Sequence, residues 1–116
     1  MALGKVYVAK AIYDFAVDGG AVGEIELAQT EIIPEGATVI RVTTNETTAL
    51  TGSDDIDIQI GSVKINTAVD YTGDTGVKSR TCVPVEISTA AAIKLDNDAV
   101  GTIDSGVVEI YVEYFL

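Results

Sequence analysis

The sequence predicts an all-β protein, an antiparallel β-sandwich of jelly-roll type with about eight strands. Residues 11–27 contain an apolar stretch, a Gly-rich turn and a second stretch that alternates apolar and acidic residues. Residues 56–60 and 107–116 alternate along their length, as strands with one buried face require. Because no segment has the periodicity of a long amphipathic helix, residues 1–116 are expected to form a single β-sandwich domain.

The N-terminal part is expected to begin with a short flexible arm, about residues 1–5, followed by a strand. This strand carries Ile12, Tyr13 and Phe15 on both of its faces. Apolar residues on both faces indicate burial on both, so part of the strand is expected to touch a neighbouring subunit. The Asp-Gly-Gly turn that follows tolerates positive φ angles, and residues 11–27 are therefore predicted to form a β-hairpin.

Turns and strands alternate through the middle of the chain. A turn at residues 32–37 leads into a strand at 38–44, and the strand at 56–60 places three isoleucines on one face. The polar, Gly-spaced residues 66–80 are expected to form the longest loop. The strand after this loop contains Pro84, which has no N–H group and therefore predicts a position at a sheet edge or a strand start.

The C-terminal segment has a regular strand pattern that runs to the end of the chain. One face carries Val108, Ile110, Val112, Tyr114 and Leu116. The other face carries Glu109, Tyr111, Glu113 and Phe115. We expect the first set to be buried in the core and the glutamates of the second set to face solvent.

The charge balance excludes several classes of partner. Eighteen acidic and seven basic residues give a net charge of -11, and the basic residues are scattered along the chain. Neither nucleic acid nor an anionic membrane is therefore expected as a partner. Hydrophobic residues still make up 47% of the chain, which indicates apolar surface covered by other copies or by a partner. The first residues lack the apolar core of a signal peptide, so synthesis in a cytoplasm is expected.

Residue types that form catalytic and metal sites are missing or unsuitably spaced. The chain has no histidine, which excludes Ser-His and Cys-His nucleophile systems. Glu109 and Glu113 lie about 13 Å apart along one strand, too far for the carboxylate pair of a glycosidase. The single cysteine, Cys82, allows no intrachain disulfide and no metal-site spacing. We therefore expect no catalytic residue, no cofactor and no metal site.

Two aspartate clusters raise the question of calcium binding. The first contains Asp54, Asp55 and Asp57, and the second contains Asp96 and Asp98. The second cluster lacks the bidentate glutamate that completes a calcium loop. Turn formation through local hydrogen bonds explains both clusters, and calcium binding is the alternative left open.

Two segments carry a resemblance to a known family. Residues 13–23 (YDFAVDGGAVG) and 110–114 (IYVEY) resemble small structural proteins of tailed bacteriophages, the head decoration or cement proteins. Looser similarity covers residues 33–40, 47–53 and 56–61. The chain departs from the family pattern at residues 66–80, so partner contacts cannot be carried over there.

The resemblance implies a non-enzymatic virion protein. Many copies would bind the outer surface of a phage capsid, with the major capsid protein as partner, and stabilise the head against internal DNA pressure. It also implies a homo-oligomer, most often a trimer, on the capsid exterior after synthesis in the host cytoplasm. The alternative is a β-sandwich recognition module, such as a phage fibre or carbohydrate-binding domain. That module would need exposed aromatic side chains, and tryptophan is absent.

The contacts of such a protein are expected on its arm, on its two-faced first strand, on its longest loop and on exposed aromatics. The candidate residues for a capsid or subunit interface are Leu3, Val6, Tyr7, Val8, Tyr13, Phe15, Tyr71 and Tyr111.

Overall fold

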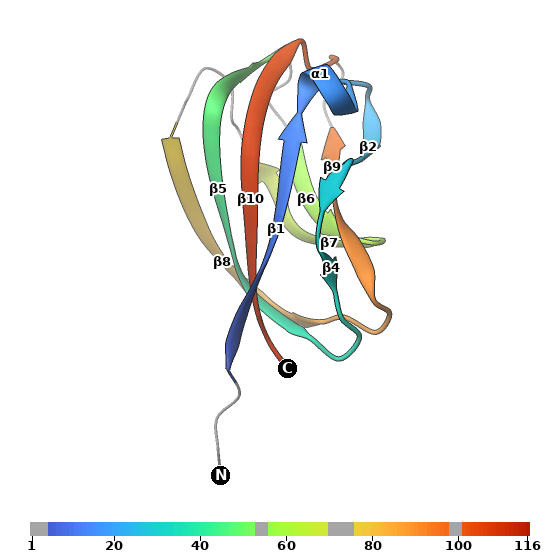
Figure 1. The fold of residues 1–116 in the computed structure, drawn as a ribbon, viewed down its shortest axis with the longest axis vertical. Coiled ribbons are helices and arrows are strands. Elements are labelled where there is room, and N and C mark those ends of the chain that lie inside the picture. Colours follow the sequence, from blue (N-terminus) through green and yellow to red (C-terminus); the bar gives the residue numbers. More distant parts are fainter. Residues whose placement is uncertain (1–4, 53–55, 70–75, 98–100) are drawn as a thin grey trace.

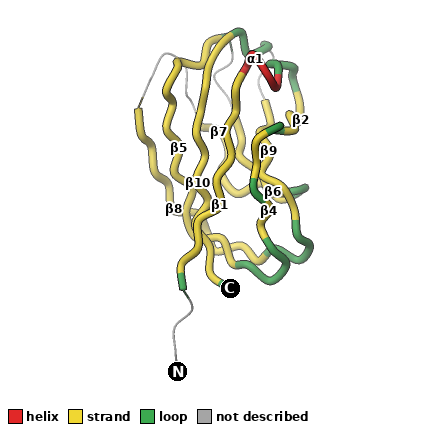
Figure 2. The backbone as a smooth tube through the Cα atoms, viewed as in Figure 1, coloured by secondary structure: helices red, strands yellow, loops and turns green. Residues whose placement is uncertain are grey.

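The protein is a sandwich of two antiparallel β-sheets with the core between them (Figure 1). The computed structural model describes residues 5–52, 56–69, 76–97 and 101–116. Its elements are β1 (Val6–Asp14), α1 (Phe15–Asp18), β2 (Gly23–Glu26), β3 (Gln29–Thr30), β4 (Ile32–Ile33), β5 (Thr38–Thr51), β6 (Ile56–Ile60), β7 (Val63–Val69), β8 (Gly76–Glu86), β9 (Ala91–Asn97) and β10 (Ser105–Phe115). Strands dominate the tube drawing, where turns and the short helix connect them at the ends of the sheets (Figure 2).

The order of the strands is that of a jelly roll. The first sheet runs β3-β1-β10-β5-β8, and the second runs β2-β9-β6-β7 with β4 paired to β9. Without the two-residue strands β3 and β4, each sheet has four strands, and all pairings are antiparallel. Eight main strands in this order confirm the predicted sandwich. Pro84 lies in β8, at the edge of the first sheet, as expected from its missing N–H group.

Strand β10 lies at the centre of the first sheet and is the main strand of the core. It pairs with β1 on one side and with β5 on the other. Val108, Ile110, Val112 and Tyr114 are buried, while the residues between them are half-buried. This confirms the predicted inward face, except that Leu116 at its end is 59% exposed.

Residues 11–27 do not form the predicted hairpin. β1 pairs with β10 and β3 in the first sheet, whereas β2 pairs with β9 in the second. The turn of helix α1 separates the two strands: Asp14 Oδ1 accepts a hydrogen bond from Ala16 N, and Gly19, with φ of 77°, ends the helix. The Gly-rich segment therefore carries the chain from one sheet to the other.

The prediction of a long loop at residues 66–80 was also wrong. β7 extends to Val69 and pairs with β6, while β8 begins at Gly76 and pairs with β5. The sequence signal was misread because polar and Gly residues also occur in strands that gain their order from pairing. Residues 70–75 lie outside the described residues.

The end of the sandwich near α1 is closed by close backbone packing. The Asn97 side chain is fully buried, and its Nδ2 lies 3.0 Å from Gly101 O, 3.3 Å from Ala21 O and 3.5 Å from Gly20 O. Gly20 O also accepts a hydrogen bond of 2.8 Å from Ile103 N. A Cβ atom at Gly20 would overlap the carbonyl of Ile103, so this approach requires glycine.

In the described part of the chain, no helix is long and apolar enough to cross a membrane.

Candidate interaction surface

The other end of the sandwich is where β1 starts and the chain ends (Figure 1). Five exposed apolar residues belong to the start of β1 and the end of the chain. On β1, Val6 and Val8 are each 53% exposed and Tyr7 is 40% exposed. Next to them, Phe115 at the end of β10 is 37% exposed, and it pairs in register with Val6. With Leu116, these five residues form the patch that we call the open end.

The two sides of the β1–β10 ribbon differ at the open end. Tyr7 and Tyr114 are register partners, and their rings stack with centroids 5.6 Å apart and an interplanar angle of 20°. Tyr114 is buried, so this stack fixes the start of β1 to the core. Val6, Val8 and Phe115 lie on the opposite, outer face, because side chains alternate along a strand.

The structure separates the predicted contact residues into groups. Val6, Tyr7 and Val8 are brought together on the surface, as the sequence analysis expected them to be. Phe15 lies in α1 and packs partly buried against the core. Leu3 and Tyr71 lie outside the described residues.

Tyr13 is not available as a surface contact, because it has no exposed area. Its hydroxyl donates a 2.5 Å hydrogen bond to Gly19 O. Burial raises the pKa of this phenol, and the nearby carboxylates of Asp18 and Asp14 raise it further. Tyr13 therefore anchors the α1 turn to the core. The sequence could not distinguish this role from a contact role, because both favour an aromatic residue.

The outer face of the first sheet carries paired charges. Lys10 Nζ lies 3.3 Å from Glu109 Oε2 and 5.4 Å from the centroid of the Tyr111 ring. Asn45 Nδ2 donates a 3.0 Å hydrogen bond to the same glutamate, and Arg41 pairs with Glu113 at 3.8 Å. The hydrogen bonds from Asn45 and then Lys10 lower the pKa of Glu109, and the hydrogen bond to Glu109 raises the pKa of Lys10. Each glutamate thus has a cationic neighbour. Tyr111 is half-buried, and its ring contacts Lys10 of this network.

On the outer face of the second sheet, one aspartate from each cluster lies next to the other. Asp57 of β6 and Asp96 of β9 are register partners, and Lys64 Nζ lies 2.9 Å and 3.0 Å from their Oδ2 atoms. Asp57 lies in the strand that was predicted at 56–60, whereas Asp96 lies in β9, so the prediction of a turn was wrong for Asp96. Asp54, Asp55 and Asp98 lie outside the described residues.

The ammonium group of Lys64 occupies the position between the two carboxylates. Its hydrogen bonds to Asp57 and Asp96, in that order, raise the pKa of Lys64. Among the described residues, no group of three or more His, Cys, Asp or Glu side chains could hold a metal ion. The arrangement is that of an ion-paired network on a sheet face.

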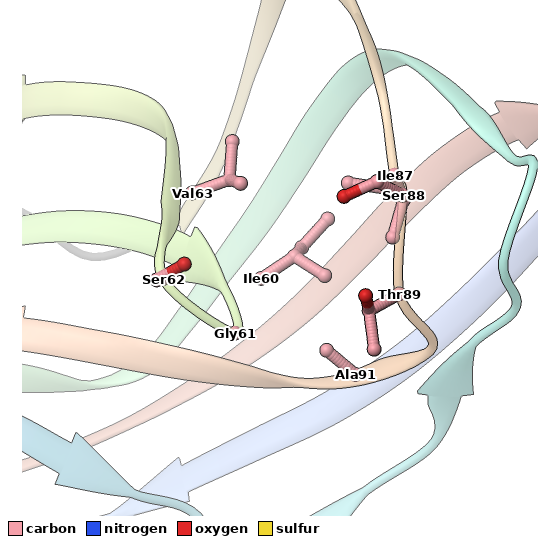
Figure 3. Close-up of a pocket in the computed structure, with 8 residues that line it drawn as sticks. All are labelled: Ile60, Gly61, Ser62, Val63, Ile87, Ser88, Thr89 and Ala91. Carbon is pink, nitrogen blue, oxygen red and sulfur yellow. The ribbon is translucent and has the colours of Figure 1, made fainter.

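A cavity of about 230 Å³ lies between the β6–β7 turn and the β8–β9 connection (Figure 3). Ile60 points into the space between the two segments, with Ile87 and Thr89 across from it. Hydroxyl groups of Ser62, Ser88 and Thr89 lie around these apolar side chains. The lining holds no charged residue, so the cavity suits an apolar group and offers no acid or base. The sequence analysis missed it, because its two walls are far apart in the chain.

Comparison with known proteins gives structural likeness and no sequence match. The chain matches no protein-family model and no curated protein sequence. A chain in the cyanophage Pam1 capsid asymmetric unit has a TM-score of 0.68 and 21% identity, with 97% of this chain and 86% of that chain covered. A chain in the acidic stable capsid structure of Helicobacter pylori bacteriophage KHP30 has a TM-score of 0.60 and 16% identity, with coverage of 98% and 90%. A chain in the capsid of Ralstonia phage GP4 has a TM-score of 0.59 and 14% identity, with 98% of this chain and 86% of that chain covered. The fold is therefore one found in phage capsid structures.

Proposed function

We propose that this protein is a capsid decoration protein, which binds the outer surface of a phage head and stabilises it. The observation that carries the proposal is the likeness of nearly the whole chain to chains of three phage capsid structures. The proposed partner is the major capsid protein, and the proposed location is the exterior of the virion.

The coverage of both chains supports an accessory role in the shell. The match spans 97–98% of this chain and 86–90% of the three neighbours, so each neighbour is only slightly longer than 116 residues. A domain of this size has one small core and fits a role as an added component of a shell. The resemblance of residues 13–23 and 110–114 to decoration proteins supports the same proposal.

The open end is the surface that fits capsid binding. It combines exposed apolar side chains with a lack of charged side chains among its five residues. Exposed apolar residues that gather in one place are typical of protein interaction sites. The net charge of -11 keeps the remaining surface acidic, which suits a protein exposed on a particle in solution.

We further propose that the protein acts as a homo-oligomer, with a trimer as the favoured state. The high hydrophobic content of 47% supports burial of surface between copies. A closed trimer also gives several binding sites at once, and such multivalency strengthens attachment to a repeating lattice.

The structure offers little to the alternative of a fibre or carbohydrate-binding module. Such a module needs exposed aromatic rings that a sugar can stack on. Within residues 5–52, 56–69, 76–97 and 101–116, the exposed large aromatics are Tyr7 and Phe115, and the Tyr7 ring is already stacked on Tyr114.

The test is addition of the purified protein to capsids that were assembled without it. Cryo-electron microscopy should show density of one such domain per binding site on the outer surface, and decorated capsids should withstand a higher temperature than bare ones. Density on the inner surface, or no binding at all, would contradict the proposal. Native mass spectrometry of the free protein tests the trimer separately.

A further inference from the structure

The start of β1 has one backbone edge without a strand partner among the described residues. Its other edge pairs with β10 along the whole of β1. On the free edge, β3 pairs only with Ala11 and Ile12. Glu31 ends this pairing, since its N–H donates a 2.9 Å hydrogen bond to Lys10 O and its Oε1 accepts one of 2.6 Å from Lys10 N.

The direction of the Lys10 N–H and C=O groups identifies which backbone groups of β1 point away from β10. Lys10 N–H and C=O both point to the β3 side of β1. Because alternate residues of an antiparallel strand direct these groups to the same side, the N–H and C=O groups of Val8 and Val6 point there too. Those of Tyr7 and Ala9 point to β10 instead, where the two residues pair with Tyr114 and Val112.

The surroundings of this edge are apolar and lead into a groove. Val6, Val8 and Phe115 flank the edge on the outer face. Further along β1, a groove of about 370 Å³ is lined by Lys10, Ala11, Ile12, Gln29, Thr30 and Glu31. An extended peptide that pairs with Val6 and Val8 would continue toward this groove.

We propose that the edge at Val6 and Val8 accepts an extended apolar segment of the capsid protein as an additional strand of the first sheet. The proposal rests on the proposed function and names the contact through which the protein binds the capsid. Backbone hydrogen bonds to Val6 and Val8 hold the segment, and its alternate side chains pack on Val6, Val8 and Phe115. The open groups select an extended backbone, which neither a helix nor a small ligand offers.

Size and symmetry favour the capsid segment over a second copy of this chain. A stable interface between two free copies uses about 20–30 residues on each side, whereas the open end supplies five. On a capsid each copy of an oligomer makes one such contact, and the contacts together hold it. If two copies paired through this edge, Val6 of each would lie opposite Val8 of the other, which is a twofold arrangement. A closed trimer has no twofold axis, so in the proposed trimer this edge stays free for the capsid.

The test compares three variants in binding to capsids assembled without the protein. Val8→Pro removes the open N–H group and places its ring at the edge, while the pairing of β1 with β10 uses the neighbouring residues. We expect a loss of capsid affinity of about tenfold or more, with a melting temperature close to that of the wild type. Val8→Ile keeps the N–H group and an apolar, β-branched side chain, and we expect it to bind within about threefold of the wild type. Val6→Pro, nearer the strand start, should repeat the effect of Val8→Pro.

Ala9→Pro is the matched control for the backbone direction. It removes an N–H group that points to β10, so it should lower the melting temperature strongly where Val8→Pro does not. Hydrogen exchange gives a second readout: the amides of Val6 and Val8 should exchange fast in the free protein and slowly on the capsid. The amides of Tyr7 and Ala9 should be slow in both states.

Each outcome has one meaning. If folded Val8→Pro and Val6→Pro proteins bind capsids as the wild type does, or the Val6 and Val8 amides stay unprotected on the capsid, the strand-addition proposal is overturned. If the wild type is a dimer that Val8→Pro converts to monomers, a second copy occupies the edge and the proposal is likewise overturned. If the wild type fails to bind capsids, the proposed function itself fails.

Discussion

The two ends of the sandwich are built from the same sheets and differ in how their backbone groups are paired. At the closed end near α1, Asn97 contacts three backbone carbonyls, and Gly20 allows the Ile103 backbone to approach closely. At the open end, Val6 and Val8 direct backbone groups to a side without a described strand, and their side chains are half exposed. Paired backbone groups make the closed end a structural element, whereas the open end is where we propose that a partner binds.

The middle of β10 lies between the two ends, and substitutions there give the largest change in stability against which the others can be compared. Ile110→Asp would place an unpaired charge among fully buried side chains, which costs several kcal/mol and can unfold a domain with about 5–15 kcal/mol of stability. Glu113→Lys is the matched change on the outer face, and it should cost about 0.5 kcal/mol or a little more. Chemical denaturation measures the free energy of unfolding of both variants. A larger loss for Glu113→Lys than for Ile110→Asp would mean that the outer face of β10 is buried by an interface.

Two glycines, one at the closed end and one in the turn beside the cavity of Figure 3, give the next largest contrast. Gly20→Ala should destabilise the closed end by about 3 kcal/mol, because its Cβ overlaps the Ile103 backbone, which cannot move aside. Gly61→Ala, in the turn beside the cavity of Figure 3, meets only the Ala91 Cβ at 3.0 Å, and its φ of 57° costs about 1–2 kcal/mol. Urea denaturation of both variants tests the order, and equal losses would show that the close approach of Gly20 to Ile103 is not what holds the closed end together.

Asn97→Ala tests the polar part of the closed end. Loss of the fully buried amide removes a donor that the carbonyls of Gly20, Ala21 and Gly101 share at this part-buried end, at a cost of about 1–2 kcal/mol. Thermal unfolding measures the loss, and hydrogen exchange should show faster opening of residues next to β9. A variant as stable as the wild type would show that the closed end depends on its glycine packing alone.

Serine substitutions at the open end should separate stability from binding. Val6→Ser and Phe115→Ser replace side chains that are 53% and 37% exposed, so each should change the free energy of unfolding by about 1 kcal/mol or less. Both should weaken capsid binding, because they remove apolar contact at the proposed interface. Unchanged binding by the double variant would move the interface elsewhere on the molecule.

The smallest expected effect concerns pH. The pKa of Glu109 lies below its ordinary value of 4.5 in the folded protein, through its hydrogen bonds with Asn45 and Lys10. Its contribution to stability is therefore present above the ordinary carboxyl pKa and is lost as the pH falls through the lowered one. Melting temperatures from pH 3 to 7 should fall slightly less steeply on acidification for Glu109→Gln than for the wild type. A slope equal to that of the wild type would show that Glu109 contributes nothing to the pH dependence.

The local sequence was sufficient for strands whose faces alternate. Ile110 and Val112 were assigned to the core correctly, because the side-chain direction in a strand depends only on position along it. At the open end, Val6, Tyr7 and Val8 were identified as candidates by their apolar character in an arm. The same reasoning failed for Tyr13, since an apolar residue can serve either a core or an interface.

Strand partners depend on segments that are far apart, and the sequence carried no reliable signal for them. The Gly-rich residues after β1 fit a hairpin and a crossing between sheets equally well, and the α1 turn decided for the crossing. Asp96 was predicted in a turn, and only the pairing of β6 with β9 placed it beside Asp57, with Lys64 between the two carboxylates. The cavity beside Ile60 depends in the same way on two distant connections.

The sequence by itself determined that the chain is an acidic β-sandwich, and for the alternating strand at the C-terminus it determined which face is buried. These properties follow from a two-residue period and from composition, and both are local. The tertiary structure decided the jelly-roll order, the closure of one end by Asn97 and Gly20, and the open edge at Val6 and Val8. Each of these depends on which backbone groups find partners across the fold, and that is settled only when the distant strands pair.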